Sequence, residues 1–325
     1  MRRRDFITLL GGTTVWPITV RSQPTSKVPR LGFLGSASPS GSAKAVHSFR
    51  MGLQDFGYVD GRTLVIEFRW AEGKYDRLPQ LVKELIAADI DVLITHGTPG
   101  TRVAKQATRT IPIVMAISGD AVATGIVASL ARPEANVTGS TFFLPQLNAK
   151  RLEVLKEALP NIAHPAGLSN PDNPVIRPII PAMQSAAMAL NLNLQVSRAH
   201  GPSEFDRAFA AMVGSSVDSV VVTEDGEFAP SFGTIARLAL ENRLPSIGAQ
   251  EYADAGGLIG YGVDVIGLYR RAAYFVDRIL KGTKPADLPV ELPTKIDLLV
   301  NLKTAKTLGV EVPLALLIRA DELIE

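Results

Sequence analysis

The sequence of 325 residues contains no cysteine and only four histidines: His47, His96, His164 and His200. The lack of cysteine excludes disulfides, thiolate nucleophiles, iron–sulfur clusters and cysteine-ligated zinc. The histidines do not stand at metal-ligand spacing, and no apolar run reaches the 18 residues that a membrane-spanning helix requires. With 34 basic and 32 acidic residues, the formal net charge of +2 is too small for a nucleic-acid-binding protein. We therefore expect no metal, no other cofactor and no nucleic-acid partner.

The familiar catalytic motifs are also missing. Residues 32–35 (Gly-Phe-Leu-Gly) lack the glycine order of a dinucleotide site, and the sequence has neither a P-loop nor a Gly-x-Ser-x-Gly nucleophile elbow. His96 is either a general base or a structural or ligand-lining residue. Glu224, Asp225 and Glu227 form either an acidic site for glycosidase or metal chemistry, or an exposed acidic turn. Because no paired nucleophile and base is found, we expect a protein without enzymatic activity.

The first 22 residues have the layout of an export signal. A basic cluster precedes a short apolar stretch from Leu9 to Val20, and small residues stand at −3 and −1 of a cleavage point after Ser22. Residues 3–7 (Arg-Arg-Asp-Phe-Ile) also fit the twin-arginine pattern. The alternative is a merely basic N-terminal tail. Removing the segment, with its four arginines and one aspartate, changes the net charge from +2 to −1, and we expect a periplasmic protein.

Short apolar strands alternate with amphipathic helices in the rest of the chain, whose 46% hydrophobic content suffices for a sizeable core. We expect strands near 28–34, 64–68, 91–95, 111–115 and 137–143, with helices over 46–56, 78–86 and 122–130. Continuous apolar strands separated by helices indicate an α/β fold with a parallel sheet that is covered on both faces.

The same pattern recurs in the second half of the chain. The strand at 91–95 is echoed at 218–223, and the one at 110–114 is echoed at 243–247. Two matched pairs at nearly one offset predict two lobes of similar topology, unless such common elements match by coincidence. Further strands are expected near 166–168, 194–196, 257–261 and 295–300, with helices over 183–190 and 268–280. We assign 28–141 and 256–285 to the first lobe, and 142–255 and 286–325 to the second.

Small and polar loops follow most of the predicted strands. Ligands of open α/β sheets bind beyond the carboxyl ends of the strands, and loops that lead into helices present backbone N–H groups to anions. Carboxylates at the same edge (Asp120, Glu224, Asp225 and Glu251) would receive a cation, so the site suits a zwitterion such as an amino acid. The alternative is a set of ordinary N-caps and turn residues. The candidate ligand-binding residues are Ser36, His96, Gly97, Thr98, Ser118, Gly119, Asp120, Phe142, Asn170, Asn173, Asp225, Phe228, Glu251 and Tyr252.

Several motifs together resemble one family, the ABC transporter substrate-binding proteins that include tryptophan- and tyrosine-type amino-acid binders. They include Gly-Tyr-Val-Asp-Gly at 57–61, Tyr-Asp-Arg-Leu-Pro at 75–79 and Asn-Val-Thr-Gly at 136–139. The others lie at 3–12, 69–73, 132–133, 255–258, 280–289 and 301–305. The resemblance implies a type I periplasmic-binding-protein fold, with two Rossmann-like lobes, parallel sheets, a multi-strand hinge and a ligand in the cleft. It also implies delivery to an ABC permease with its ATPase, and we expect a monomer.

The resemblance extends to the loops that carry many of the candidate residues. Ser36 and the segments 97–99, 119–120, 170–171 and 173–174 match family loop positions. The chain departs from the family pattern at Ala121, Asp172 and 223–228, all on the expected cleft side. The ligand therefore need not be the one that tryptophan-type members bind.

We assign hypothetical roles because a charge taken out of water requires a partner. Ser36, Thr98 and nearby backbone N–H groups would bind a carboxylate, and Asp120 with Glu251 would bind an ammonium group. Phe142, Phe228 and Tyr252 would supply apolar contacts, although Phe142 and Phe143 either line the cleft or pack the hinge. Two other functions remain open: a sensory module that reports to a membrane receptor, and an enzyme of doubly wound fold.

Overall fold

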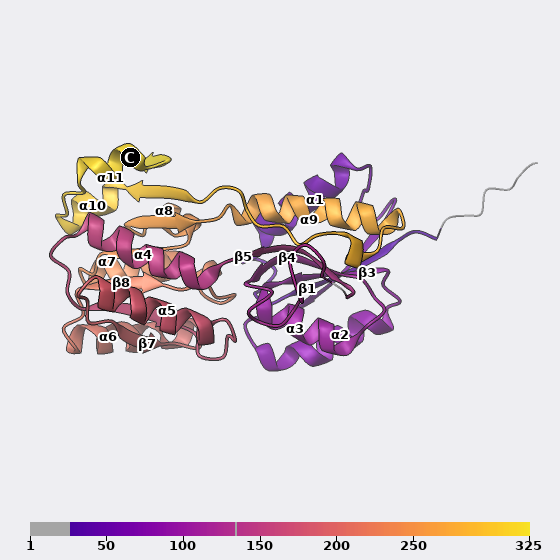
Figure 1. The fold of residues 1–325 in the computed structure, drawn as a ribbon, viewed down its shortest axis with the longest axis horizontal. Helices are drawn as coiled ribbons and strands as arrows, with labels where there is room; N and C mark the ends of the chain where they lie inside the picture. Colours follow the sequence, from indigo (N-terminus) through magenta and orange to yellow (C-terminus); the bar gives the residue numbers. More distant parts are fainter. Residues whose placement is uncertain (1–26, 134) are drawn as a thin grey trace, which may run out of the picture.

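The chain folds into two α/β lobes that lie side by side along the long axis of the molecule (Figure 1). A computed structural model describes residues 27–133 and 135–325. The predicted export signal and its cleavage point after Ser22 lie outside the described residues. Among the described residues, no helix combines the length and the apolar character needed to cross a bilayer.

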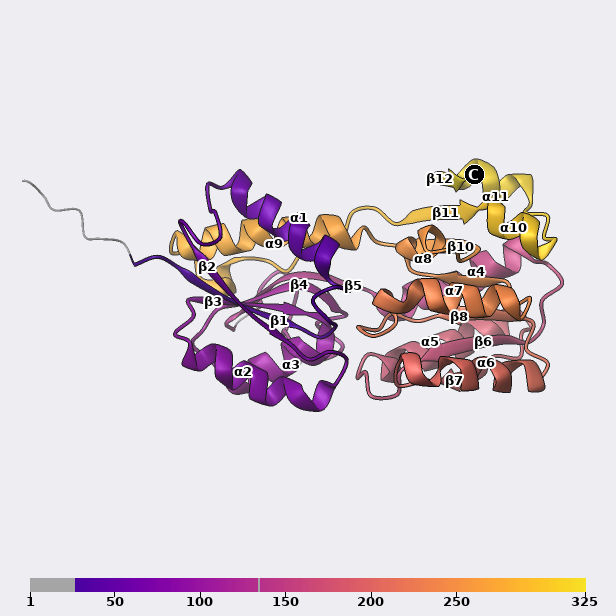
Figure 2. The same cartoon turned by 180° about the vertical axis from the view of Figure 1, so that it is seen from behind.

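The first lobe is built on a parallel sheet of five strands in the order β2-β1-β3-β4-β5. Helices α1 and α9 pack on one face of this sheet, and α2 and α3 cover the other (Figures 1 and 2). The elements are β1 (Arg30–Gly35), α1 (Ala43–Asp55), β2 (Val65–Trp70), η1 (Tyr75–Arg77), α2 (Leu78–Ala87), β3 (Val92–His96), α3 (Gly97–Ala107), β4 (Ile113–Gly119), β5 (Val137–Phe142), α9 (Val265–Leu280) and η4 (Pro285–Asp287). The predicted apolar spacing of α2 is observed, since Leu78, Leu81, Val82 and Leu85 are all buried.

The second lobe contains a sheet of seven strands in the order β12-β11-β10-β9-β8-β6-β7. Its elements are α4 (Leu144–Ala158), β6 (Pro165–Ser169), α5 (Ile176–Ala189), β7 (Gln195–Arg198), η2 (Pro202–Glu204), α6 (Phe205–Gly214), β8 (Ser219–Val222), η3 (Ala229–Ser231), α7 (Phe232–Glu241), β9 (Ser246–Gly248), α8 (Gln250–Asp254), β10 (Ile259–Gly262), β11 (Asp297–Asn301), α10 (Leu302–Leu308), α11 (Leu314–Arg319) and β12 (Glu322–Ile324). β10 and β11 pair antiparallel, whereas the neighbouring pairs β9–β10 and β11–β12 run parallel.

The chain crosses between the lobes at three short connections. They join β5 to α4 at 142–144, β10 to α9 at 262–265, and the segment after η4 to β11 at 291–297. The last crossing starts beside β5, where the Thr141 amide donates to the Glu291 carbonyl at 2.9 Å. Figures 1 and 2 show the second and third connections running side by side along the upper edge. Together they form the hinge.

The lobe boundaries differ from the prediction at two places. Residues 259–262 form β10, which pairs with β9 and β11 in the second sheet and not in the first lobe. Residues 286–291 stay with the first lobe, because the Val290 amide donates to Leu130 and the Glu291 amide to Gly139. Apolar strands of either lobe look alike in sequence, and only their pairing partners distinguish them.

The predicted helix over 122–130 is wrong, because the structure has consecutive turns there. The amides of Ile126 and Val127 both donate to the Ala121 carbonyl, at 2.8 and 3.0 Å, which interrupts a helical ladder. Gly125 has a φ of +71°, a left-handed conformation that no α-helix contains. Ile126 and Val127 are nevertheless buried in the first lobe, and their burial explains the apolar pattern that suggested a helix.

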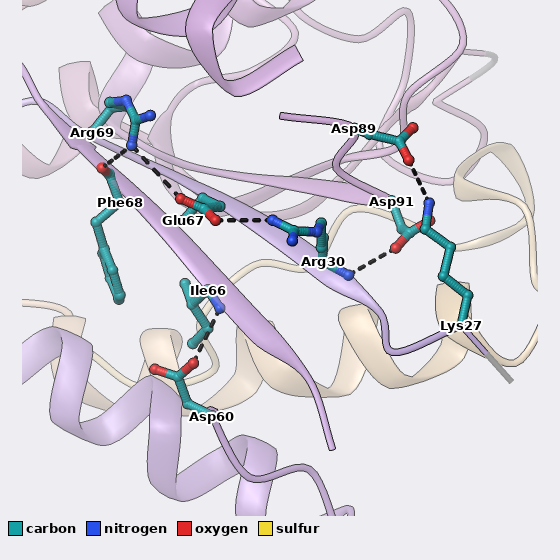
Figure 3. Close-up of polar contacts among 9 residues, drawn as sticks. All are labelled: Lys27, Arg30, Asp60, Ile66, Glu67, Phe68, Arg69, Asp89 and Asp91. Carbon is teal, nitrogen blue, oxygen red and sulfur yellow. Dashed lines mark hydrogen bonds and ion pairs between the residues drawn. The ribbon is translucent and has the colours of Figure 1, made fainter. Parts of the chain in front are cut away.

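Charged side chains tie the amino ends of β1, β2 and β3 together (Figure 3). Lys27 Nζ lies 2.6 Å from Asp89 Oδ2, and the Arg30 amide donates to Asp91 Oδ2 at 2.7 Å. Arg30 Nη1 in turn lies 3.0 Å from Glu67 Oε1 on β2. Pairs as exposed as these contribute little to stability, because water and salt screen them. Their main effect is to favour one register of the three strands.

We predict that Gly139→Ala destabilises the protein much more than Gly57→Ala. Both glycines have positive φ angles, +124° and +85°, but a Cβ at Gly139 would lie 2.2 Å from the Met115 carbonyl oxygen. Nothing lies within 4 Å of a Cβ at Gly57. The left-handed strain common to both costs about 1–2 kcal/mol, and only Gly139→Ala also pushes β5 away from β4. Urea unfolding should therefore separate the two losses by at least about 2 kcal/mol, and equal losses would contradict the packing described here.

Candidate functional site

A cavity of about 670 Å³ lies between the two lobes, a volume typical of small-molecule sites. Its wall is formed in the first lobe by the loop after β1, the carboxyl ends of β3 and β4 and the start of α3. The second lobe contributes the loops after β6 and β8 and the start of α8, and the start of α9 completes the wall. Most of the candidate residues line it: Ser36, His96, Gly97, Thr98, Ser118, Gly119, Phe142, Asn173, Asp225 and Glu251. Topology brings them together, since the carboxyl ends of parallel strands meet at one edge of each sheet.

Four candidate residues do not line the cavity and have other roles in the structure. Phe228 is fully buried and packs edge-on against Phe205 at 5.4 Å between ring centroids. The fully buried Tyr252 shares a hydrogen bond of 2.8 Å with the Ser246 hydroxyl. Asp120 Oδ1 accepts the amide of Ala123 at 2.9 Å and so caps a turn.

The fourth, Asn170, stabilises the loop after β6. Its side-chain amide donates to the His200 carbonyl at 3.3 Å, and its oxygen accepts the Asp172 amide at 3.0 Å. Asp172 itself is an exposed residue of this turn. Turn-forming contacts of this kind were the alternative to ligand binding, and they account for Asn170 and Asp120.

In the first-lobe wall, the hydroxyl groups that were expected to bind a carboxylate are engaged within the protein, and backbone amides are the candidate donors. The Ser36 hydroxyl donates to the His96 carbonyl at 3.0 Å. The Thr98 oxygen lies 3.2 Å from the Ser118 hydroxyl and accepts the Gly119 amide at 3.2 Å. Because α3 begins at Gly97, the first-turn amides of Gly97 and Thr98 have no acceptor within the helix. An anion in the cavity would find its donors there.

The second-lobe wall carries a carboxylate that forms no ion pair among the described residues. Glu251, in the first turn of α8, lines the cavity and has no ion pair and no hydrogen bond to another side chain among the described residues. Burial raises the pKa of Glu251, its own backbone amide lowers it, and of the nearby charges Asp264 raises it while Arg151 lowers it. Asp264 caps α9 through the Gly267 amide at 2.8 Å. This wall therefore favours a cationic group over an anionic one.

A second acidic residue of this wall, Glu224, forms an ion pair with Arg151, which is buried inside the second lobe. Arg151 lies on α4 with 0% exposure, and its Nη2 is 2.6 Å from Glu224 Oε1. Its Nε donates to the Tyr261 carbonyl at 2.8 Å, while Asn148 donates to the other Glu224 oxygen at 2.8 Å. The sequence did not reveal Arg151, because a basic residue among the charged positions of a helix is normally exposed.

Asp225 is also buried, and three donors already satisfy it. Its Oδ2 accepts the Tyr75 hydroxyl at 2.9 Å and the Asn173 amide at 3.0 Å, and its Oδ1 accepts the backbone amide of Glu227 at 2.9 Å. Burial raises the pKa of Asp225, which these hydrogen bonds partly counteract. Tyr75, 150 residues away on the first lobe, was not among the candidates.

His96 lines the cavity in contact with Tyr269 of α9, another residue that sequence reasoning missed. The two rings are stacked with centroids 5.8 Å apart, and the Tyr269 hydroxyl hydrogen-bonds to His96 Nδ1. Burial lowers the pKa of His96 to about 4, so the ring is neutral at physiological pH. Burial raises the pKa of Tyr269, which keeps its proton. His96 is a weak base in this setting.

The comparisons with known proteins agree with this architecture. A family model for ABC transporter substrate binding protein matches residues 37–324. A tyrosine-binding protein of Clostridioides difficile is 26% identical over 269 residues, which cover 82% of this chain and 77% of that protein. The structure of an ABC domain from Streptococcus pneumonia in complex with L-Trp is 25% identical, with a TM-score of 0.81 over 90% of this chain and 100% of that one.

A conserved domain protein from Vibrio cholerae is likewise 25% identical, with a TM-score of 0.85 over 91% of this chain and all of that one. With the two parallel-sheet lobes described above, these similarities confirm the predicted type I periplasmic-binding-protein fold.

We predict that Arg151→Met lowers the free energy of unfolding by about 3–5 kcal/mol, because it leaves the Glu224 carboxylate buried without a counter-charge. The double variant Arg151→Met/Glu224→Leu should regain at least about 1 kcal/mol of that loss. Arg237→Met is the control: it breaks an exposed pair with Glu241 and should leave the free energy of unfolding nearly unchanged, because solvent screens that pair. Guanidinium unfolding measures all three, and equal effects of Arg151→Met and Arg237→Met would refute the buried pair.

The low pKa of His96 predicts a specific pH dependence of stability. Its ordinary pKa is 6.5 and its value in the folded protein is about 4. As the pH falls through this interval, the unfolded chain takes up the proton first. The contribution of His96 is therefore complete above pH 6.5 and decreases by about 3 kcal/mol toward pH 4.

His96→Gln should lack this decrease. The difference in unfolding free energy between the two proteins should then shrink from pH 7 to pH 4. An NMR titration of the His96 ring with a midpoint near 6.5 would contradict this prediction.

Proposed function

Since the chain belongs to the ABC transporter substrate-binding protein family, we propose that it binds an amino acid or a related carboxylate in the cavity between its lobes and delivers it to the permease of an ABC importer. The observation that carries this proposal is the polarity of the cavity. One lobe offers the first-turn amides of α3, which have no acceptor within the helix, and the other offers the carboxylate of Glu251, which has no ion pair among the described residues. A zwitterion satisfies both walls at once.

The proposed binding mode places one end of the ligand on each lobe. The α-carboxylate accepts from the first-turn amides of Gly97 and Thr98 on α3, where the helix dipole adds a partial positive charge. The ammonium group pairs with Glu251 on α8 of the second lobe. A ligand held at both ends stabilises the closed arrangement of the lobes, because an open cleft would leave one charge without its partner.

The remaining wall favours an aromatic side chain. The rings of Phe142, Phe232 and Tyr269 line the cavity, and stacked or edge-on aromatic contacts add to the apolar area that is buried. The names of two similar proteins, a tyrosine binder and a complex with L-Trp, support the same ligand class. Phe143 lies outside the cavity and is 42% exposed, so only Phe142 of the pair contributes.

The predicted export signal and the family context support a location in the periplasm, facing a permease in the cytoplasmic membrane. In this role the ligand is bound and released unchanged.

Isothermal titration calorimetry with L-Trp, L-Tyr and L-Phe tests the ligand class. We expect the deaminated analogue indole-3-propionate and the decarboxylated analogue tryptamine each to bind at least about 30-fold more weakly than L-Trp. Absence of binding by all three amino acids, or conversion of a ligand, would contradict the proposal.

Glu251→Gln should weaken the binding of L-Trp by about 30-fold or more, because it leaves the ammonium group buried without a counter-charge. The same substitution should barely affect indole-3-propionate, which lacks that group. Asp120→Asn is the matched control: Asp120 lies outside the cavity and should leave L-Trp affinity within threefold. Equal losses for L-Trp and indole-3-propionate would show that Glu251 does not contact the ammonium group.

A further inference from the structure

The Tyr75 hydroxyl joins the lobes across the cavity, away from the hinge, through two hydrogen bonds. The Tyr75 hydroxyl, on η1 before α2 of the first lobe, donates to Asp225 Oδ2 after β8 of the second lobe at 2.9 Å. The Gly226 amide also approaches the Tyr75 oxygen at 3.4 Å. In Figures 1 and 2, α2 lies along the lower side of its lobe, whereas the connections at 262–265 and 291–297 run along the upper edge. Opening the lobes about these connections would break the Tyr75–Asp225 contact.

The acceptor is held in place within its own lobe. Asn173 and the Glu227 amide fix the Asp225 carboxylate, which is 6% exposed. Burial, together with the charge of Asp225, raises the pKa of Tyr75, so its hydroxyl keeps the proton that it donates. Opening would therefore remove a single donor from a carboxylate that otherwise stays fixed. The contact can break and re-form without unfolding either lobe.

Around this contact, glycines let the backbone of one lobe lie directly against atoms of the other lobe. A Cβ at Gly226 of the second lobe would lie 3.2 Å from the Ser36 Cβ of the first. A Cβ at Gly41 of the first lobe would lie 2.6 Å from Pro230 Cγ of the second. Since the proline ring is rigid, it cannot swing aside as a flexible side chain would. The closed arrangement thus depends on the absence of side chains at these points.

We propose that Tyr75 and Asp225 form a latch, supported by the glycine contacts, that keeps the lobes closed and sets the rate at which bound ligand escapes. The inference rests on the proposed function. A ligand enclosed between the lobes leaves only after they open, and opening breaks the latch.

Tyr75→Phe removes one hydrogen bond to a carboxylate and should accelerate dissociation at least about tenfold. Association should change little, because the ligand enters the open form.

A measurement of lobe separation tests the latch without any ligand. The chain has no native cysteine, so spin labels attach only at introduced positions, Ala87→Cys on α2 and Ala211→Cys on α6, both exposed. Double electron–electron resonance spectroscopy then gives the distribution of distances between the two labels, and so between the lobes. We expect Tyr75→Phe to shift the population toward longer distances. Tyr58→Phe is the control, since the Tyr58 hydroxyl bonds Asp277 within the first lobe and should cause no shift.

A second variant acts through shape instead of hydrogen bonding. Gly41→Ala places a methyl group against Pro230 and should also lengthen the distance and speed the release of L-Trp, the probe ligand. Gly214→Ala is its control, because nothing lies within 4 Å of that Cβ. Urea unfolding verifies that each variant is folded.

Distance distributions and L-Trp dissociation rates that equal those of the wild type, for both Tyr75→Phe and Gly41→Ala, would overturn the latch. If the wild type does not bind L-Trp, the proposed ligand class fails. The distance measurement still decides the latch in that case.

Discussion

A charge that loses water between two lobes must find a partner, because the effective penalty is several kcal/mol per ion. This constraint accounts for the arrangement of the cavity wall. Arg151 neutralises Glu224 from inside the second lobe. Asp225 is satisfied by Tyr75, Asn173 and a backbone amide. Glu251 is a carboxylate of this wall that has no ion pair among the described residues, and the first turn of α3 lines the wall of the other lobe. The site is thus defined by which groups remain unsatisfied.

The fold places these groups on two bodies that can move. Each sheet brings its strand ends to the cavity, and three short connections join the lobes. Closure of this type needs changes in backbone angles at only a few positions. The antiparallel pairing of β10 with β11 belongs to this design, since the chain leaves the second lobe after β10 and returns to it with β11. Helix α9, between these strands, carries Tyr269 into the cavity from the first lobe.

Much of the architecture followed from local patterns. Both lobes contain apolar strands and amphipathic helices of the predicted type. Most of the polar segments at strand ends also lie where the sequence predicted them. Two kinds of prediction failed. The segment 122–130 has helical spacing of apolar residues, yet Gly125 and the shared Ala121 carbonyl make it a series of turns. Phe228 and Tyr252 stand near strand ends as ligand-binding aromatics would, but their rings face the core of the second lobe. Proximity in sequence to a site does not fix the direction of a side chain.

The sequence by itself determined the α/β class, the presence of two lobes and the polar strand ends, because periodicity and loop chemistry are local properties of the chain. The tertiary structure alone decided which charges are paired. Arg151 meets Glu224 across 73 residues, and Tyr75 meets Asp225 across 150. Such contacts depend on how whole elements pack and on how much water they exclude. The spacing of residues in the sequence predicts neither the packing of distant elements nor the exclusion of water. Only the folded protein therefore distinguishes the structural carboxylates from the one proposed to bind ligand.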